Sequence, residues 1–118
     1  MYEIEFYEDE NGYSETAEFI QILNRQTSKN ARINLTKIVA YFNELEKYGT
    51  RIGQPVTKHL KGEIWELRPL RNRILYAYVK DNKFIMLCVF LKKTRKTPKH
   101  EIEKANKYLS DYIERNEK

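Results

Sequence analysis

Seven cationic side chains between residues 68 and 96 are the strongest candidates for chemistry in this sequence. Arg68, Arg71 and Arg73 lie within "ELRPLRNRILY", and "KKTRK" supplies Lys92, Lys93, Arg95 and Lys96. When a ribose 2′-hydroxyl attacks the adjacent phosphate, preorganised guanidinium and ammonium groups stabilise the charge that builds up. A lysine among arginines could also act as a general base. The alternative is that these cations only position a nucleic-acid backbone, and chemistry alone favours binding over catalysis.

The distribution of charge supports a polyanionic partner. Residues 1–49 carry five Lys/Arg against nine Asp/Glu, whereas residues 50–118 carry seventeen against eight. Between residues 51 and 100 there are thirteen basic and three acidic side chains. Phosphate backbones are the commonest partners of such a surface, although scattered lysines can also serve solubility alone.

Other classes of site have little support. Two histidines without ligand spacing and the lack of a Gly-rich phosphate loop argue against a metal or a cofactor. The single cysteine, Cys88, lies in the apolar run "FIMLCVFL" and is expected in the core of a protein from a reducing compartment. The acidic start "MYEIEFYEDE" does not resemble a signal peptide, and residues 84–91 are too short to span a membrane. A cytoplasmic protein is expected.

The pattern of the chain predicts the elements that must position the cations. Alternating apolar residues predict a strand over 2–8, and Ser14 and Ser28 are predicted to cap two helices, the second ending at Gly49. Residues 50–62 are expected to be a loop, followed by strands at 63–68, 73–80 and 83–91, with a two-residue turn at Asp81–Asn82 between the last two. Thr97 is predicted to cap a last helix that has Pro98 at its first position. The order β-α-α-β-β-β-α predicts one α+β domain over residues 1–118, with helices on a mostly antiparallel sheet.

This arrangement predicts where the cations meet. Glu66 and Arg68 share one strand face, and Arg73 begins the next strand. In a meander, the end of the first strand, the start of the second and the exit of the third meet at one edge, so five or six cations should converge. Trp65 and Leu67 are expected to pack against helices.

The segments "GEIWELRPLRNRILYAY" and "FLKKTRKTPKHEIEKANKY" resemble the Gp49-like, phage-derived HigB branch of the RelE/HigB toxin superfamily. Three motifs of that branch occur in order: Gly-x-x-x-Glu-Leu-Arg, Arg-x-x-Tyr and Phe-x-Lys-Lys-Thr-x-x-Thr-Pro. The resemblance implies a RelE-like fold and the toxin of a type II toxin–antitoxin pair. Such a toxin cleaves mRNA on the ribosome. Its partner would be a HigA-like helix-turn-helix antitoxin, through which the complex binds operator DNA.

The resemblance also assigns roles to residues. It implies that Arg68, Arg73 and Lys93 are catalytic. It matches Lys92 and Lys96 to cations of the family, and together with Arg71 and Arg95 of the cationic cluster these are the candidates for RNA contacts. Phe90 is a candidate for stacking on a base, with an ordinary residue of the sheet as the alternative. The chain departs from some relatives at Glu66, where they carry a lysine, and neither His100 nor Tyr108 matches their late proton-transfer residue securely. A ParE-like gyrase inhibitor and a non-catalytic RNA-binding module remain alternatives.

Overall fold

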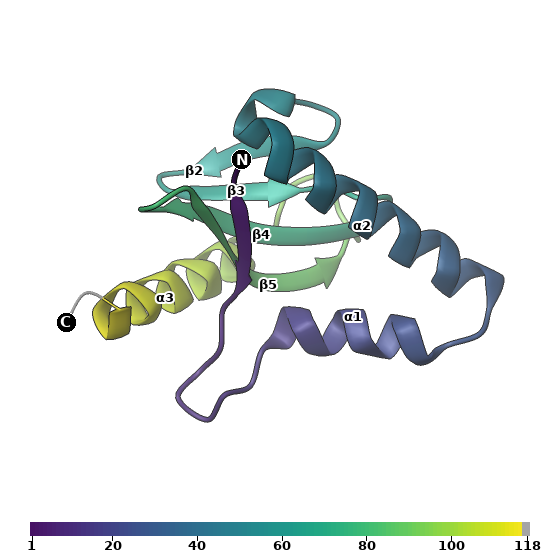
Figure 1. Cartoon of the computed structure of the whole chain (residues 1–118), viewed down its shortest axis with the longest axis horizontal. Helices are drawn as coiled ribbons and strands as arrows, with labels where there is room; N and C mark the ends of the chain where they lie inside the picture. The colour runs from purple at the N-terminus through teal and green to yellow at the C-terminus, as the bar shows by residue number, and fades with distance from the viewer. Residues whose placement is uncertain (117–118) are drawn as a thin grey trace.

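A five-stranded sheet forms the centre of the protein in the computed structural model, which describes residues 1–116 (Figure 1). Its strands are β1 (Glu3–Phe6), β2 (Thr57–Lys61), β3 (Ile64–Leu67), β4 (Asn72–Val79) and β5 (Lys83–Leu91). Their order across the sheet is β1-β5-β4-β3-β2, with β1 parallel to β5 and the other pairs antiparallel. The expected α+β class with a mostly antiparallel sheet is confirmed.

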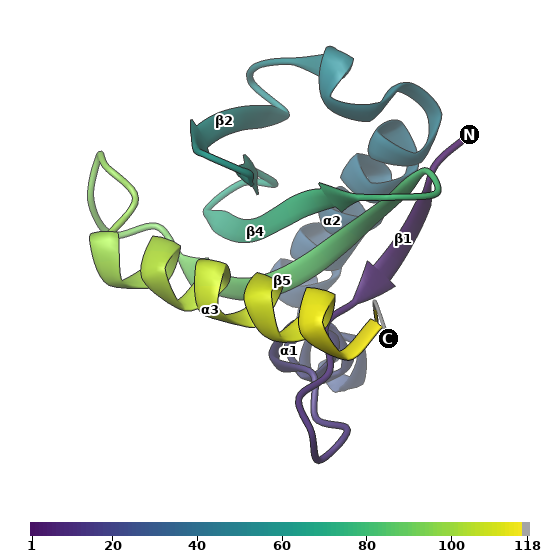
Figure 2. The same cartoon turned by 90° about the vertical axis from the view of Figure 1, so that its left-hand side faces the viewer.

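The three helices cover the two faces of this sheet. They are α1 (Glu15–Arg25), α2 (Lys29–Tyr48) and α3 (Lys99–Asn116), with a short 3₁₀ turn, η1 (Gly49–Ile52), after α2. The predicted caps are present, since Ser14 accepts a hydrogen bond from the Ala17 amide and Ser28 accepts one from the Ala31 amide, both at 3.1 Å. Viewed from the side, α3 lies in front of β5 and α2 lies behind the sheet (Figure 2).

Two apolar cores result from this layering. The core on the α1/α2 side contains Ile38 and Leu45 of α2 and Leu67 of β3, with Trp65 packed at its margin as expected. The core under α3 contains Leu75, Leu87 and Cys88, closed by Ala105 and Leu109. Burial raises the pKa of the Cys88 thiol to about 12, so this cysteine is a protonated core residue, as expected.

The prediction of a loop over residues 50–62 is wrong in part. It contains η1 and the additional strand β2, which pairs with β3 so that Thr57 lies opposite Leu67. Lys58, His59 and Lys61 are exposed on this edge strand, and only Thr57 is buried. An edge strand with so little buried surface shows almost no apolar alternation, which is why the sequence did not reveal it.

A β-bulge in β5 determines which residues of that strand face α3. Leu75 lies opposite Cys88 while Tyr76 lies opposite Met86, so Leu87 is the extra residue. Leu87 and Cys88 therefore both belong to the core under α3. Beyond the bulge the alternation is reversed, and Phe90 lies on the α3 face opposite Arg73.

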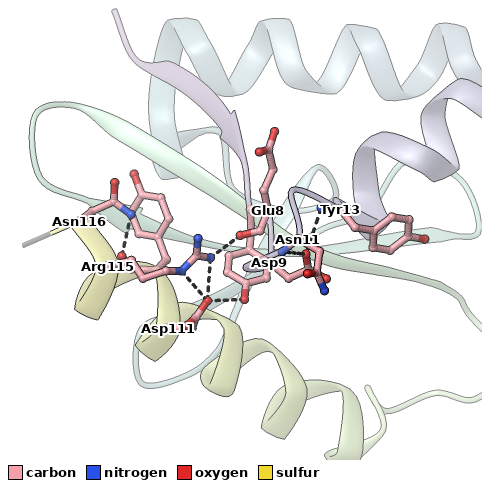
Figure 3. Close-up of polar contacts among 9 residues, drawn as sticks. Glu8, Asp9, Asn11, Tyr13, Asp111, Arg115 and Asn116 are labelled. Carbon is pink, nitrogen blue, oxygen red and sulfur yellow. Dashed lines mark hydrogen bonds and ion pairs between the residues drawn. The ribbon is translucent and has the colours of Figure 1, made fainter.

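Polar contacts fix the far half of α3 against the segment that follows β1. The Tyr7 hydroxyl donates a 2.6 Å hydrogen bond to Asp111, and Arg115 donates to the same carboxylate at 2.7 Å. Arg115 also donates to the Glu8 carbonyl (Figure 3). These contacts hold α3 in place, and with it the loop that precedes the helix. Within residues 1–116, every helix is too short or too polar to span a bilayer.

Candidate phosphate-binding site

The cationic residues gather in a shallow hollow where β3 ends, β4 begins and β5 leaves the sheet. The segment between β5 and α3 closes it as a projecting loop (Figure 2). The lining residues are Glu66, Arg68, Arg73, Phe90, Lys92, Lys93, Thr94, Arg95, Lys96, Thr97 and Pro98. The enclosed volume is only about 10 Å³, so a ligand would rest on the hollow rather than enter it.

Arg73 is the most rigidly held cation. Its side chain is 8% exposed, and Nη1 donates to the carbonyl oxygens of Leu70 at 2.8 Å and Asn72 at 2.9 Å. Leu70 has a φ of 59°, which turns the backbone between β3 and β4 tightly. Burial, with the nearby Arg68 charge, lowers the pKa of Arg73 from its usual value. The guanidinium is therefore fixed in direction and largely removed from water.

Glu66 is the buried anion at the centre of the cluster. It is 3% exposed, and its Oε1 lies 3.4 Å from Nε of Arg68 and 3.9 Å from Nε of Arg73. Its other oxygen accepts a hydrogen bond from the Thr97 hydroxyl. One carboxylate thus joins the end of β3, the start of β4 and the segment before α3.

Sequence reasoning missed this role of Glu66. The alternation of β3 correctly placed Glu66 on the face of Arg68, but Arg73 and Thr97 reach the carboxylate only through the tertiary fold. Thr97 was expected to cap α3, whereas its hydroxyl is directed to Glu66 and the helix begins at Lys99.

Arg71 lies beside the hollow rather than in its wall. Its Nη2 donates to the Lys92 carbonyl at 3.0 Å, and the Lys92 amide donates to the Arg71 carbonyl at 2.8 Å. Arg71 thus fastens the exit of β5 to the start of β4. The remaining expected RNA contacts, Arg95 and Lys96, are exposed on the loop with Lys93, and Phe90 lies under them, partly buried.

The two candidates for proton transfer lie apart from the cluster of buried groups. His100 is 77% exposed at the start of α3, with Nε2 3.4 Å from Glu101. Tyr108 stacks on Tyr7 with ring centroids 4.7 Å apart, and burial raises its pKa. Tyr108 is therefore a packing residue of α3. The lining of the hollow contains six cations and one carboxylate, and neither His100 nor Tyr108 is part of it.

The hollow combines two kinds of cation. Arg73 and Arg68 are held by Glu66 on the sheet, while Lys93, Arg95 and Lys96 extend from the loop. Guanidinium groups held in place orient a phosphate through directed hydrogen bonds, and the exposed cations of the loop add positive charge from outside. With six cations against one carboxylate, the lining as a whole is strongly positive and suits a phosphodiester.

A solved structure shares the fold of this chain. The solved structure of the YoeB–YefM complex from Staphylococcus aureus contains a chain similar to this one, with a TM-score of 0.57 and 15% sequence identity. The match covers 79% of this chain and 99% of that chain, and it shows a shared fold. No curated protein sequence matches significantly.

The profile of the family described as "Phage derived protein Gp49-like" matches residues 25–110. That span includes β2 to β5 and most of α3, and with them every residue of the hollow. The chain belongs to the Gp49-like family of phage-derived proteins, a branch of the RelE/HigB toxin superfamily.

Proposed function

We propose that this protein is the toxin of a type II toxin–antitoxin pair and an endoribonuclease that cleaves mRNA in the ribosomal A site. The observation that carries the proposal is the convergence of Arg68, Arg73 and Lys93 on one solvent-open hollow in a chain of this family. The fold shared with a toxin–antitoxin complex supports an antitoxin partner. We further propose that this partner is a HigA-like helix-turn-helix protein through which the complex binds operator DNA, and that the toxin acts in the cytoplasm.

The proposed reaction builds negative charge on the phosphoryl oxygens and transfers two protons. The 2′-oxygen forms a bond to phosphorus as its proton passes to a lysine of the hollow or to solvent, and the bond to the 5′-oxygen breaks as that oxygen takes a proton from solvent. The products are a 2′,3′-cyclic phosphate and a 5′-hydroxyl. Arg68, Arg73 and Lys93 would stabilise the phosphoryl oxygens, where negative charge grows in the transition state. No metal ion is required by this step.

The remaining cations would hold the RNA. Lys92, Arg95 and Lys96 line the hollow around the proposed catalytic groups, and Arg71 lies beside it, hydrogen-bonded to the Lys92 carbonyl. Phe90 would stack on a base. Because the hollow offers few acid–base groups, the ribosome would contribute by orienting the message for in-line attack.

The test is induction in a bacterial host without the partner gene, with primer extension on an abundant message to map new 5′ ends. Wild type should arrest growth and cut within translated codons. Lys93→Ala, an exposed change in the hollow, should lower cleavage about 100-fold or more. The matched control is Lys107→Ala on α3, outside the hollow, which should cut like wild type.

Each other outcome contradicts the proposal in its own way. Growth arrest with a DNA-damage response and no new 5′ ends would favour a ParE-like gyrase inhibitor. Growth without arrest would favour a non-catalytic RNA-binding module. Cleavage that is unchanged in Lys93→Ala would remove this hollow from the reaction.

A further inference from the structure

The loop between β5 and α3, residues 92–98, is fastened to the sheet at both of its ends. At the first end, the Lys92 amide donates a hydrogen bond to the Arg71 carbonyl at 2.8 Å. At the second end, the Thr97 hydroxyl donates a hydrogen bond to the Glu66 carboxylate. The first contact joins two backbone groups, whereas the second depends on the chemistry of a single side chain.

The stretch between these two contacts carries the exposed cations of the hollow. Lys93, Arg95 and Lys96 are all exposed, and they belong to no helix or strand. Within residues 1–116, no hydrogen bond joins residues 93–96 to the sheet. The Thr94 hydroxyl donates to the Lys96 carbonyl at 2.7 Å, which is a contact inside the loop. The positions of these cations therefore depend on how the two ends of the loop are held.

The hydroxyl and the carboxylate at the second end both have restricted freedom. Pro98 limits the backbone of Thr97 to extended conformations, and a β-branched side chain has few rotamers. Glu66 is 3% exposed and lies beside Arg68 and Arg73, so the acceptor cannot turn away to water. A contact between two restricted groups costs little conformational entropy, and it fixes the loop at a defined distance from the two arginines.

The proposed reaction is sensitive to the position of an ammonium group in only one of its two roles. Attraction of an RNA backbone by positive charge is not directional, and it persists when a lysine moves by a few ångströms. Stabilisation of charge in a transition state requires a donor that already lies at the right place, and a displacement of about 1 Å can cost about 100-fold in rate. Loosening the loop should therefore affect the chemical step more than binding.

We propose that Thr97 is a positioning residue of the reaction, which acts through Glu66 to hold Lys93 beside Arg68 and Arg73. The inference rests on the proposed function, because it assumes that these three cations act on one phosphate. It gives the Thr97 hydroxyl a role that neither contact with RNA nor capping of α3 supplies. The buried carboxylate then has two tasks, since it separates the two arginines and also anchors the loop.

The test uses purified protein and ribosomes programmed with a short message whose cleavage site has been mapped. Thr97→Val, which keeps the shape of the side chain but lacks the hydroxyl, should lower the maximal cleavage rate about tenfold. The ribosome concentration that gives half of this rate should change less than about twofold, because every cation is retained. Thr97→Ser, which keeps the hydroxyl, should cut nearly like wild type. Thr27→Val, at an exposed position between α1 and α2, is the matched control and should also cut like wild type.

A double variant distinguishes positioning of Lys93 from a general loss of structure. If Thr97 acts through Lys93, its hydroxyl is of no use once the ammonium is absent. In the Lys93→Ala background, Thr97→Val should therefore lower the remaining cleavage rate less than about twofold. A structural defect would lower it by the same factor in both backgrounds.

A measurement of loop mobility tests the same inference without cleavage. A nitroxide can be attached to Arg95→Cys alone, because the natural Cys88 is fully buried. Electron paramagnetic resonance lines of the label should be sharper, and the loop thus more mobile, when Thr97→Val is added. Thr97→Ser should leave the lines unchanged.

Equal cleavage by wild type and Thr97→Val would overturn the inference while leaving the ribonuclease intact. So would an equal loss in Thr97→Ser, or an undiminished effect of Thr97→Val in the Lys93→Ala background. Failure of wild type to cut the message would overturn the proposed function. Unchanged spectra in Thr97→Val would overturn the inference independently, since they would show that the hydroxyl does not hold the loop.

Discussion

Glu66 shows how a single buried carboxylate can organise a cationic site. Two guanidinium groups so close together repel one another, and burial of Arg73 removes the water that would screen them. A carboxylate between them offsets this repulsion and, through Thr97, links the cationic loop to the sheet. When one member of a buried group of charges is removed, the remaining charges are uncompensated. The resulting loss of folding free energy is far larger than the net contribution of the whole group to stability.

Glu66→Gln should therefore lower the free energy of unfolding by about 3 kcal/mol. The amide keeps the shape of the side chain and can still accept from Thr97, but it no longer neutralises Arg68 and Arg73. Chemical denaturation at neutral pH measures the change. Glu63→Gln, the same replacement at an exposed position next to β3, is the control and should change stability by less than about 0.5 kcal/mol. Equal effects of the two substitutions would show that Glu66 does not hold the arginines.

Among the elements, those with local signals could be predicted from the sequence. The turn at Asp81 and Asn82 is an example, since both residues adopt the left-handed φ values, 67° and 58°, that their side chains tolerate. The cap residues Ser14 and Ser28 are others. Features that depend on distant partners were not accessible: the parallel pairing of β1 with β5, the edge strand β2 and the bulge at Leu87.

Helix α3 depends on a contact whose strength should vary with pH. The hydrogen bond from Tyr7, and after it the one from Arg115, hold the pKa of Asp111 below its ordinary value of 3.8. The ionised form is thus favoured in the folded state. Its contribution is present above the ordinary carboxyl pKa and is lost as pH falls through the lower, folded value.

We expect hydrogen-exchange protection of the second half of α3 to decrease below about pH 4 in wild type, with β4 unaffected. In Asp111→Asn the protection should already be reduced at neutral pH and should vary less with acid, because the neutral amide cannot ionise. Asp81→Asn, in a turn that accepts asparagine, is the control. Protection of α3 that stays the same in Asp111→Asn would mean that the apolar contacts of Ala105 and Leu109 suffice to hold the helix.

At the scale of the whole molecule, the position of the candidate site results from two things: where the basic residues lie in the sequence, and the order of the strands in the sheet. The sequence placed the basic residues after position 50, and the antiparallel order of β3, β4 and β5 brought six of them to one end of the sheet. That convergence was predicted because a meander returns its strand ends to the same edge. The positions of Glu66 and Thr97 within it were not, since no local pattern links a strand residue to the segment before a distant helix.

The same distribution of charge predicts how salt affects RNA binding. Basic side chains also lie on α2, where Lys29, Arg32 and Lys37 line a separate hollow, so the cationic hollow must be distinguished from general surface charge. If about four cations of the hollow contact phosphates, log K plotted against log salt for a single strand should have a slope of about −3. A 2′-O-methyl oligonucleotide, which cannot be cleaved, allows this measurement by fluorescence anisotropy.

The double variant Lys93→Ala/Lys96→Ala should make that slope shallower by about 1.4, because two counterion-releasing contacts are lost. Lys29→Ala/Lys37→Ala changes net charge equally but lies away from the hollow, and it should leave the slope unchanged. Equal effects of the two pairs would mean that RNA responds to net charge alone. A shift confined to the loop pair would mean that phosphates of the RNA contact the loop between β5 and α3, next to Arg73.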